Sequence, residues 1–142
     1  MGRRLGLVTI DPVFIDWHER QIRADALQGR LAGVRAIHID LPGFMEAFTD
    51  EEAYQRVRAD FVAQVRPLVA AGAEVIIPAG GLPMMLFSGE MDGAPVINGI
   101  TVIAKSAEMA IKLRRLGAAK VSRRSNFARP PEKSLKEFLE HG

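Results

Sequence analysis

The sequence predicts an α/β fold in which a doubly wound, mainly parallel sheet of four strands carries helices on both faces. Two observations lead to this prediction. Short apolar segments rich in β-branched residues alternate with longer segments whose apolar residues recur every three or four positions. The segment Ala73–Ile77 is nearly all apolar, as expected of a parallel strand covered on both faces. Strands separated by helices of this length form βαβ units, whose strands run parallel.

The first strand is predicted over Leu5–Ile10, and the pair Asp11-Pro12 ends it. Asp11 is a good helix N-cap and Pro12 a good first helical residue, so a helix is expected to begin here. Its rough apolar stripe consists of Phe14, Trp17 and Ile22. The helix is expected to end before Gly29 or Gly33.

The second strand is predicted over Val34–Asp40, with Leu41–Gly43 as the turn that ends it. Thr49–Glu52 has the pattern of a capping box and predicts the start of a long helix. Gly72 is placed to end this helix, and Pro67 to kink its last turn. The apolar residues behind the cap, spaced as on one helical face, are Tyr54, Val57, Phe61, Val65 and Leu68.

The third strand, Ala73–Ile77, leads directly into Pro78–Gly81, and a short fourth strand is predicted over Ala94–Ile97 after a loop from Gly89 to Gly93. The last long helix is predicted from about Ile100 to Gly117. Its expected buried stripe consists of Ile103, Ala104, Ala107, Ile111 and Leu116. The sequence thus predicts one flavodoxin-like domain over residues 1–117, and a basic tail over 118–142 with a short helix from Glu132 to Glu140.

Composition excludes several classes of protein. The chain has 142 residues, enough for one domain, and no Cys, so it has no disulfide, thiolate zinc site or thiol nucleophile. The three His residues show no metal-site spacing, and His18 and His141 are expected to face solvent. No apolar run approaches the ~20 residues of a membrane span, and Leu5–Val8 is too short for a signal peptide, which predicts a cytoplasmic protein with no membrane partner.

Basic residues are concentrated in the last third of the chain, although the formal net charge is only +2. A nucleic-acid patch is one interpretation, and a solvated helix end followed by a polar tail is the other. The second is favoured, because Phe127 and Phe138 stand alone and no aromatic residues are interleaved for base stacking. The basic residues are Lys112, Arg114, Arg115, Lys120, Arg123, Arg124, Arg129, Lys133 and Lys136.

Ligands of parallel sheets bind outside the carboxyl ends of the strands, so the residues that follow each strand are the candidate site. Pro78–Gly81 is the most informative of these segments, because paired glycines after a buried strand let backbone N–H groups approach an anion. The segment matches neither a phosphate-binding P-loop nor a dinucleotide fingerprint. A carboxylate or another oxyanion is therefore the favoured ligand, and a tight strand-to-helix turn without a ligand is the alternative.

Four polar residues at the other strand ends have two interpretations each. Asp11 is either a helix cap or a base, and Asn98 either caps the last helix or binds a ligand. His38 and Asp40 fall on one face of the predicted strand, where they are either an acid–base pair or ordinary surface residues.

Several stretches, taken in order, resemble the aspartate/glutamate/hydantoin racemase family, specifically its hydantoin racemase branch. The resemblance covers most of this chain and about half of the usual length of the family. Residues 3–9 and 29–37 are similar to the beginning of the family's second half. The other matching stretches are 72–82, 93–99, 105–117 and the basic tract Ser122-Arg123-Arg124.

The resemblance implies a cofactor-independent enzyme of two similar α/β halves, each with a cysteine that takes or returns a proton at the substrate's α-carbon. Ala79 stands where the second-half cysteine would be. Racemisation by two thiols is therefore not expected of this chain alone. The resemblance implies a pocket for a small carboxylate or hydantoin-like ring, formed by Thr9, Ala79, Gly80, Gly81 and Asn98.

Three functions remain open from the sequence. The first is a racemase-like enzyme without a metal or cofactor, whose candidate catalytic residues are Asp11, His38 and Asp40. The second is a non-catalytic ligand-binding or interaction module, and a half-length chain of this kind is expected to form a homodimer. The third, a nucleic-acid-binding protein, is the least favoured.

Overall fold

The computed structural model describes residues 3–118, 128 and 130–141. The chain divides into two compact units, Met1–Ala104 and Lys105–Gly142. The second unit contains α6 (Glu132–His141), where the sequence predicts a short helix. Part of the predicted basic tail lies outside the described residues, namely Lys120, Ser122, Arg123, Arg124 and Arg129.

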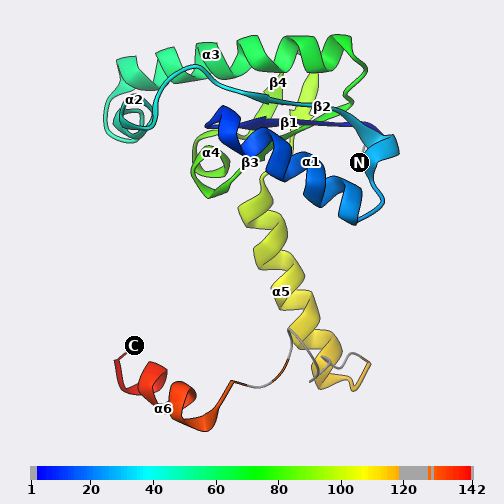
Figure 1. Cartoon of the computed structure of the whole chain (residues 1–142), viewed down its shortest axis with the longest axis vertical. Coiled ribbons are helices and arrows are strands. Elements are labelled where there is room, and N and C mark those ends of the chain that lie inside the picture. The colour runs from blue at the N-terminus through cyan, green and yellow to red at the C-terminus, as the bar shows by residue number, and fades with distance from the viewer. Residues whose placement is uncertain (1–2, 119–127, 129, 142) are drawn as a thin grey trace. The chain divides into compact units, whose positions relative to one another are not determined.

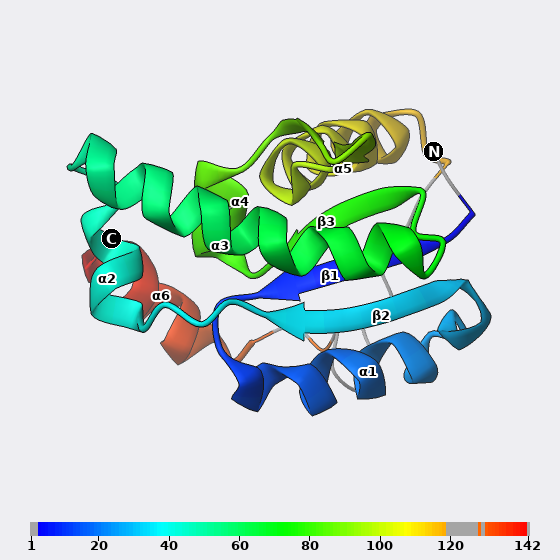
Figure 2. The same cartoon turned by 90° about the horizontal axis from the view of Figure 1, so that it is seen from above.

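The first unit is built on a mostly parallel sheet with the strand order β2-β1-β3-β5-β4, which confirms the predicted α/β class. Figure 2 shows β2, β1 and β3 side by side. Strands β1 (Leu5–Thr9), β2 (Leu31–Ala36), β3 (Val75–Ala79) and β5 (Ala94–Val96) are parallel. β1 and β3 lie side by side at the centre of the sheet. Every residue of β3 is buried except Ile77, which is half-buried. This burial on both faces explains the continuous apolar pattern of β3.

The sheet has five strands, not the predicted four. The additional strand, β4 (Gly89–Met91), pairs antiparallel with β5 at the edge of the sheet, in the segment predicted as a loop. Asp92 and Gly93 connect the two strands with φ values of 50° and 78°. Positive φ at both central residues is the geometry of a tight hairpin turn, which Asp-Gly sequences favour.

The second strand was predicted too far along the chain, since β2 ends at Ala36 and not at Asp40. The predicted turn Leu41–Gly43 is instead the beginning of a short helix, α2 (Leu41–Glu46). Asp40 is the N-cap of this helix, because its Oδ1 accepts a hydrogen bond from the backbone N–H of Gly43 at 3.0 Å. Proline is tolerated in a first helical turn, so Pro42 does not prevent the helix.

Helices cover both faces of the sheet (Figure 1). On one face lies α3 (Glu51–Ala70), which confirms the long helix predicted there, although its N-cap is Asp50 and not Thr49. On the other face lies α1 (Ile15–Ala24), preceded by the 3₁₀ turn η1 (Pro12–Phe14). A second 3₁₀ turn, η2 (Gln28–Arg30), leads into β2, and the short helix α4 (Gly81–Leu86) follows β3.

The core lies between α3 and the sheet. Phe61 of α3 and Phe87, after α4, have ring centroids 4.1 Å apart, and Phe44 of α2 meets Phe87 edge to face at 6.5 Å. All three rings are at most 1% exposed. This packing joins α2 and α3 to the segment that follows β3, and so fixes the strand ends that carry the candidate site.

The apolar stripe predicted to be buried on the last long helix is exposed. Every residue from Ile100 to Ala118, which includes most of α5 (Gly99–Arg115), is exposed. Ile103 and Leu116, for example, are 67% and 79% exposed. Helical periodicity predicts which residues share a face and says nothing of what packs against that face.

Candidate functional site

Thr9 and Ala79 form the floor of the candidate site. They are the last residues of β1 and β3, and they are register partners on these neighbouring parallel strands. Thr9 is 1% exposed and Ala79 4% exposed. The carboxyl ends of parallel strands meet at one edge of a sheet, so the structure brings together two of the residues that the sequence singled out.

The hydroxyl of Thr9 is buried and has no hydrogen-bond partner within the described part of the chain. Buried hydroxyls are nearly always paired, because leaving one unpaired costs about 1–3 kcal/mol. Thr9 also lines a pocket, so a ligand oxygen or nitrogen entering that pocket could supply the missing partner.

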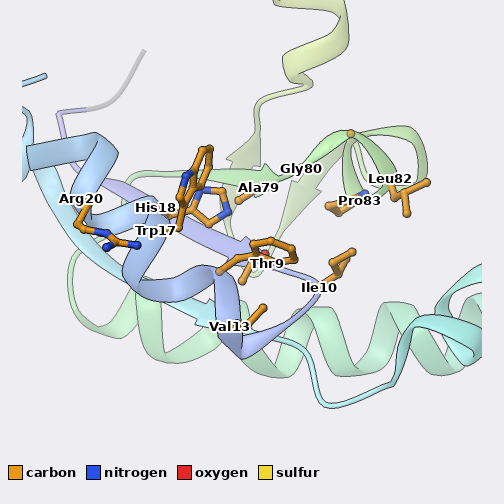
Figure 3. Close-up of a pocket in the computed structure, with 12 residues that line it drawn as sticks. Thr9, Ile10, Val13, Trp17, His18, Arg20, Ala79, Gly80, Leu82 and Pro83 are labelled. Atoms are coloured by element: carbon orange, nitrogen blue, oxygen red, sulfur yellow. The ribbon is translucent and has the colours of Figure 1, made fainter. Parts of the chain in front are cut away.

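The pocket above this floor, which we call the strand-end pocket, has a volume of about 540 Å³ (Figure 3). One wall is formed by η1 and α1, and the other by the turn after β3 and the beginning of α4. Most lining residues are apolar. They are Thr9, Ile10, Val13, Phe14, Trp17, His18, Arg20, Ala79, Gly80, Gly81, Leu82 and Pro83.

The turn after β3 requires a glycine. Gly80 has φ 118° and ψ 156°, a backbone conformation that other residues adopt only with strain. Gly80 and Gly81 are exposed and line the pocket, as the sequence predicts for residues that approach a ligand. Gly81 has ordinary backbone angles and open space where a Cβ would lie, so it is less constrained than Gly80.

His18 lines the strand-end pocket, although the sequence predicted that it faces solvent. Its imidazole lies beside the indole of Trp17, edge to face with centroids 4.9 Å apart, and Figure 3 shows both rings on the α1 side of the pocket. Burial lowers the pKa of His18 from its usual value. Helical periodicity could not predict that either ring lines a pocket, because the opposite wall comes from the segment after β3.

The three candidate catalytic residues lie together, but around a second pocket of about 460 Å³. Asp11, His38 and Asp40 line it, and Ile10 and Phe14 line both pockets. The two carboxylates cap helices: Oδ1 of Asp11 accepts from the backbone N–H of Val13 at 2.8 Å, and Asp40 caps α2. The predicted capping role of Asp11 is therefore present in the structure.

His38 and Asp40 do not form the predicted pair on one strand face, because β2 ends before either residue. The side chain of His38 instead meets α3, where Oδ1 of Asp60 and Nε2 of Gln64 each lie 3.1 Å from its Nδ1. The other carboxylate oxygen, Oδ2, accepts the backbone N–H groups of His38 and Ile39 at 2.6 and 3.0 Å. Asp60 thus replaces the sheet ladder as the hydrogen-bond partner of this segment.

Burial opposes ionisation of Asp60, but hydrogen bonds outweigh it and hold the pKa of this carboxyl below its usual value. They come from the backbone of His38 and Ile39 and from the side chains of Gln64 and His38. Gln64 in turn accepts a hydrogen bond from Nε of Arg35 at 3.0 Å. Asp60 could not be singled out from the sequence, because no local pattern signals its long-range partners at residues 38 and 39.

Asn98 is not among the residues lining either pocket. Its Oδ1 accepts from the backbone N–H of Thr101 at 3.0 Å, and its Nδ2 donates to the backbone carbonyl of Met84 at 3.1 Å. The structure thus uses Asn98 as a cap at the start of α5 and as a link to α4.

Within the described ranges, no group of three or more His, Asp or Glu residues is arranged to hold a metal ion. No helix in the same part of the chain is long and apolar enough to cross a membrane.

The sequence model of the Asp/Glu/hydantoin racemase family matches residues 1–107. The fold is similar to allantoin racemase from Pseudomonas fluorescens, with 25% identity and a TM-score of 0.66 over 93% of this chain and 54% of that one. It is also similar to allantoin racemase from Klebsiella pneumoniae, with 22% identity and a TM-score of 0.67 over 92% of this chain and 50% of that one. The chain thus spans about half the length of these racemases. No curated protein sequence matches it significantly.

Proposed function

The chain belongs to the Asp/Glu/hydantoin racemase family, and from this premise we propose that it binds a small carboxylate or a hydantoin-type ring in the strand-end pocket without a cofactor. One observation carries the proposal: the buried hydroxyl of Thr9 lines this pocket and has no partner in the described part of the chain. A ligand oxygen or ring nitrogen would satisfy it.

The composition of the pocket supports the proposal. Small-molecule sites are mostly apolar and carry a few polar groups that orient the ligand. The strand-end pocket has this character, because Ile10, Phe14 and Trp17 line it together with Thr9 and Arg20. A cationic guanidinium is well suited to an anionic ligand, since it presents several donors to a carboxylate.

The proposed function excludes racemisation by two thiols. The resemblance implies a cysteine at position 79, and this chain has alanine there and no Cys elsewhere. A methyl group neither accepts nor returns a proton. Since one positioned acid–base group contributes typically about 10²–10⁴-fold in rate, loss of the thiols removes most of the proton transfer that they would supply.

Ligand binding is testable by titration calorimetry with two probes, enantiopure 5-benzylhydantoin and L-aspartate. We expect millimolar or tighter binding of at least one probe. Thr9→Val should weaken it roughly fivefold or more, because a hydrogen bond of about 1 kcal/mol is lost. Thr9→Ser keeps the hydroxyl and serves as the matched control. If neither probe binds, or if Thr9→Val binds as well as the wild type, the proposal fails.

A second candidate function is a non-catalytic module that forms a homodimer. The exposed apolar residues of α5 and the half-length match to the two racemases favour it. Light scattering should give twice the mass of the 15.6 kDa chain. Ile103→Lys should shift the mass toward that of a monomer, whereas Ser106→Lys, an exposed polar position on the same helix, is the control. A monomer at high concentration would contradict the dimer.

A further inference from the structure

We propose that His18 is the acid–base group of the strand-end pocket, and that it exchanges the α-proton of the bound ligand with solvent on one face only. This inference rests on the proposed ligand binding and goes beyond it, because it assigns a reaction, the proton-transfer residue and a stereochemical outcome.

The lining of the pocket singles out His18. Within the described lining, the side chains with polar groups are those of Thr9, Trp17, His18 and Arg20. A threonine hydroxyl is too weak a base, an indole N–H is a donor only, and a guanidinium stays protonated at all working pH values. An imidazole, in contrast, has an ordinary pKa close to neutrality and can both take and return a proton. His18 is therefore the lining residue suited to general acid–base catalysis.

The position of His18 suits proton transfer to a ligand held at the floor. His18 projects from α1, whereas Thr9 and Ala79 end the central strands, and all three line one pocket (Figure 3). The neighbouring indole of Trp17 lies edge to face against the imidazole, with ring centroids 4.9 Å apart. A ligand whose oxygen meets the Thr9 hydroxyl would thus lie between the floor and the imidazole.

The surroundings of His18 favour a neutral imidazole. Burial lowers its pKa, which favours the neutral ring that can act as a base. No carboxylate is found among the described lining residues, and the charged side chain there is Arg20, a cation. Asp16 and Glu19, also on α1, lie with Arg20 and Arg23 around a separate surface depression.

The reaction balances without a further reactant. A ring nitrogen of His18 takes the proton from the α-carbon, and the electron pair of the broken C–H bond moves into the adjacent carbonyl, which becomes an enolate oxygen. The Thr9 hydroxyl donates a hydrogen bond to that oxygen, where charge develops. The imidazolium exchanges its proton with solvent and returns one to the carbon, restoring the carbonyl.

One base on one face returns the proton to the side from which it was taken. At the floor of the pocket, Ala79 beside Thr9 has a methyl group, which cannot transfer a proton. The described lining contains no second acid on the side opposite His18. In D₂O, the α-position should therefore acquire deuterium while the configuration of the carbon is retained. This outcome distinguishes the proposal from racemisation, in which exchange and inversion occur together.

The test incubates the full chain with enantiopure 5-benzylhydantoin in D₂O. NMR follows the α-proton and chiral chromatography follows the enantiomers, each against a protein-free sample. We expect deuterium uptake above background with no matching loss of enantiomeric purity. His18→Gln should reduce the enzymatic rate at least about 100-fold. Glu19→Gln, the next position on α1 and outside the pocket lining, should leave it unchanged.

A pH profile of the wild type keeps the test decisive if His18→Gln does not fold. The exchange rate should fall as the pH decreases through a value below 6.5, where the imidazole becomes protonated. Calorimetry on the same samples separates the two proposals. Binding without exchange, exchange that survives His18→Gln, or inversion at the rate of exchange would overturn the role of His18 and leave ligand binding standing. Absence of binding would overturn both.

Discussion

The carboxylate of Asp60 on α3 contacts both the backbone and the side chain of His38. Its Oδ2 accepts a hydrogen bond from the backbone N–H of His38 at 2.6 Å, and its Oδ1 lies 3.1 Å from Nδ1 of His38. The side chain of Asp60 is only 13% exposed, whereas that of His38 is 78% exposed. The segment between β2 and α2 is thus anchored to α3 by one carboxylate.

Asp60→Asn should destabilise the fold by about 1–3 kcal/mol, because an ionised acceptor of two backbone hydrogen bonds is replaced by a neutral amide. Urea denaturation monitored by circular dichroism measures the change. Glu90→Gln, at an exposed position on β4, is the matched loss of a carboxylate and should change stability by less than about 0.5 kcal/mol. Equal effects of the two substitutions would show that the anchor contributes nothing specific.

The contribution of Asp60 should depend on pH. Because the folded protein holds the pKa of this carboxyl below its unfolded value, the ionised form stabilises the fold. The contribution is fully present above about pH 4 and is lost as the pH falls through the folded pKa. The stability difference between the wild type and Asp60→Asn should therefore shrink in acid, as measured by urea titrations at several pH values. A difference that stays constant down to about pH 2 would contradict this assignment.

Thr9→Val should stabilise the ligand-free protein by about 1 kcal/mol, even though it weakens ligand binding. The substitution keeps the branched shape and removes a buried hydroxyl that has no partner in the described part of the chain. Thermal unfolding without ligand measures the effect. A loss of stability would mean that the hydroxyl has a partner in the ligand-free protein.

Gly80→Ala should cost about 1–3 kcal/mol, because φ 118° and ψ 156° are accessible almost exclusively to glycine. Gly81→Ala is the control, since Gly81 has no positive φ and no atom within 4 Å of the place that a Cβ would take. Differential scanning calorimetry of the two variants compares them directly. Similar melting temperatures would show that the turn relaxes without strain.

Ala79→Cys should report on the strand-end pocket, because the chain contains no other thiol. Alkylation by iodoacetamide, followed by mass spectrometry, should slow when 5-benzylhydantoin is bound over residue 79. Ser88→Cys places the thiol at an exposed position outside the pocket lining and should react at a rate that does not depend on ligand. Equal protection of both thiols would point to a general effect of the ligand on the protein.

The sequence by itself determined the α/β class, the central strands and the family. Local periodicity predicts strands such as Ala73–Ile77 and the amphipathic helix around Val57 and Phe61. The parallel topology then predicts which residues meet, because the carboxyl ends of parallel strands lie at the same edge of the sheet. Thr9, which is distant in the sequence from Ala79, Gly80 and Gly81, could therefore be predicted to lie beside them, and all four line one pocket.

Only the tertiary structure decided which side chains meet across elements. It paired His38 with Asp60, turned His18 into the pocket and left the Thr9 hydroxyl without a partner in the described part of the chain. The physical reason is that periodicity specifies the face of a helix or strand on which a residue lies. Whether that face meets a carboxylate, a cavity or solvent depends on elements elsewhere in the chain, whose packing no local pattern encodes.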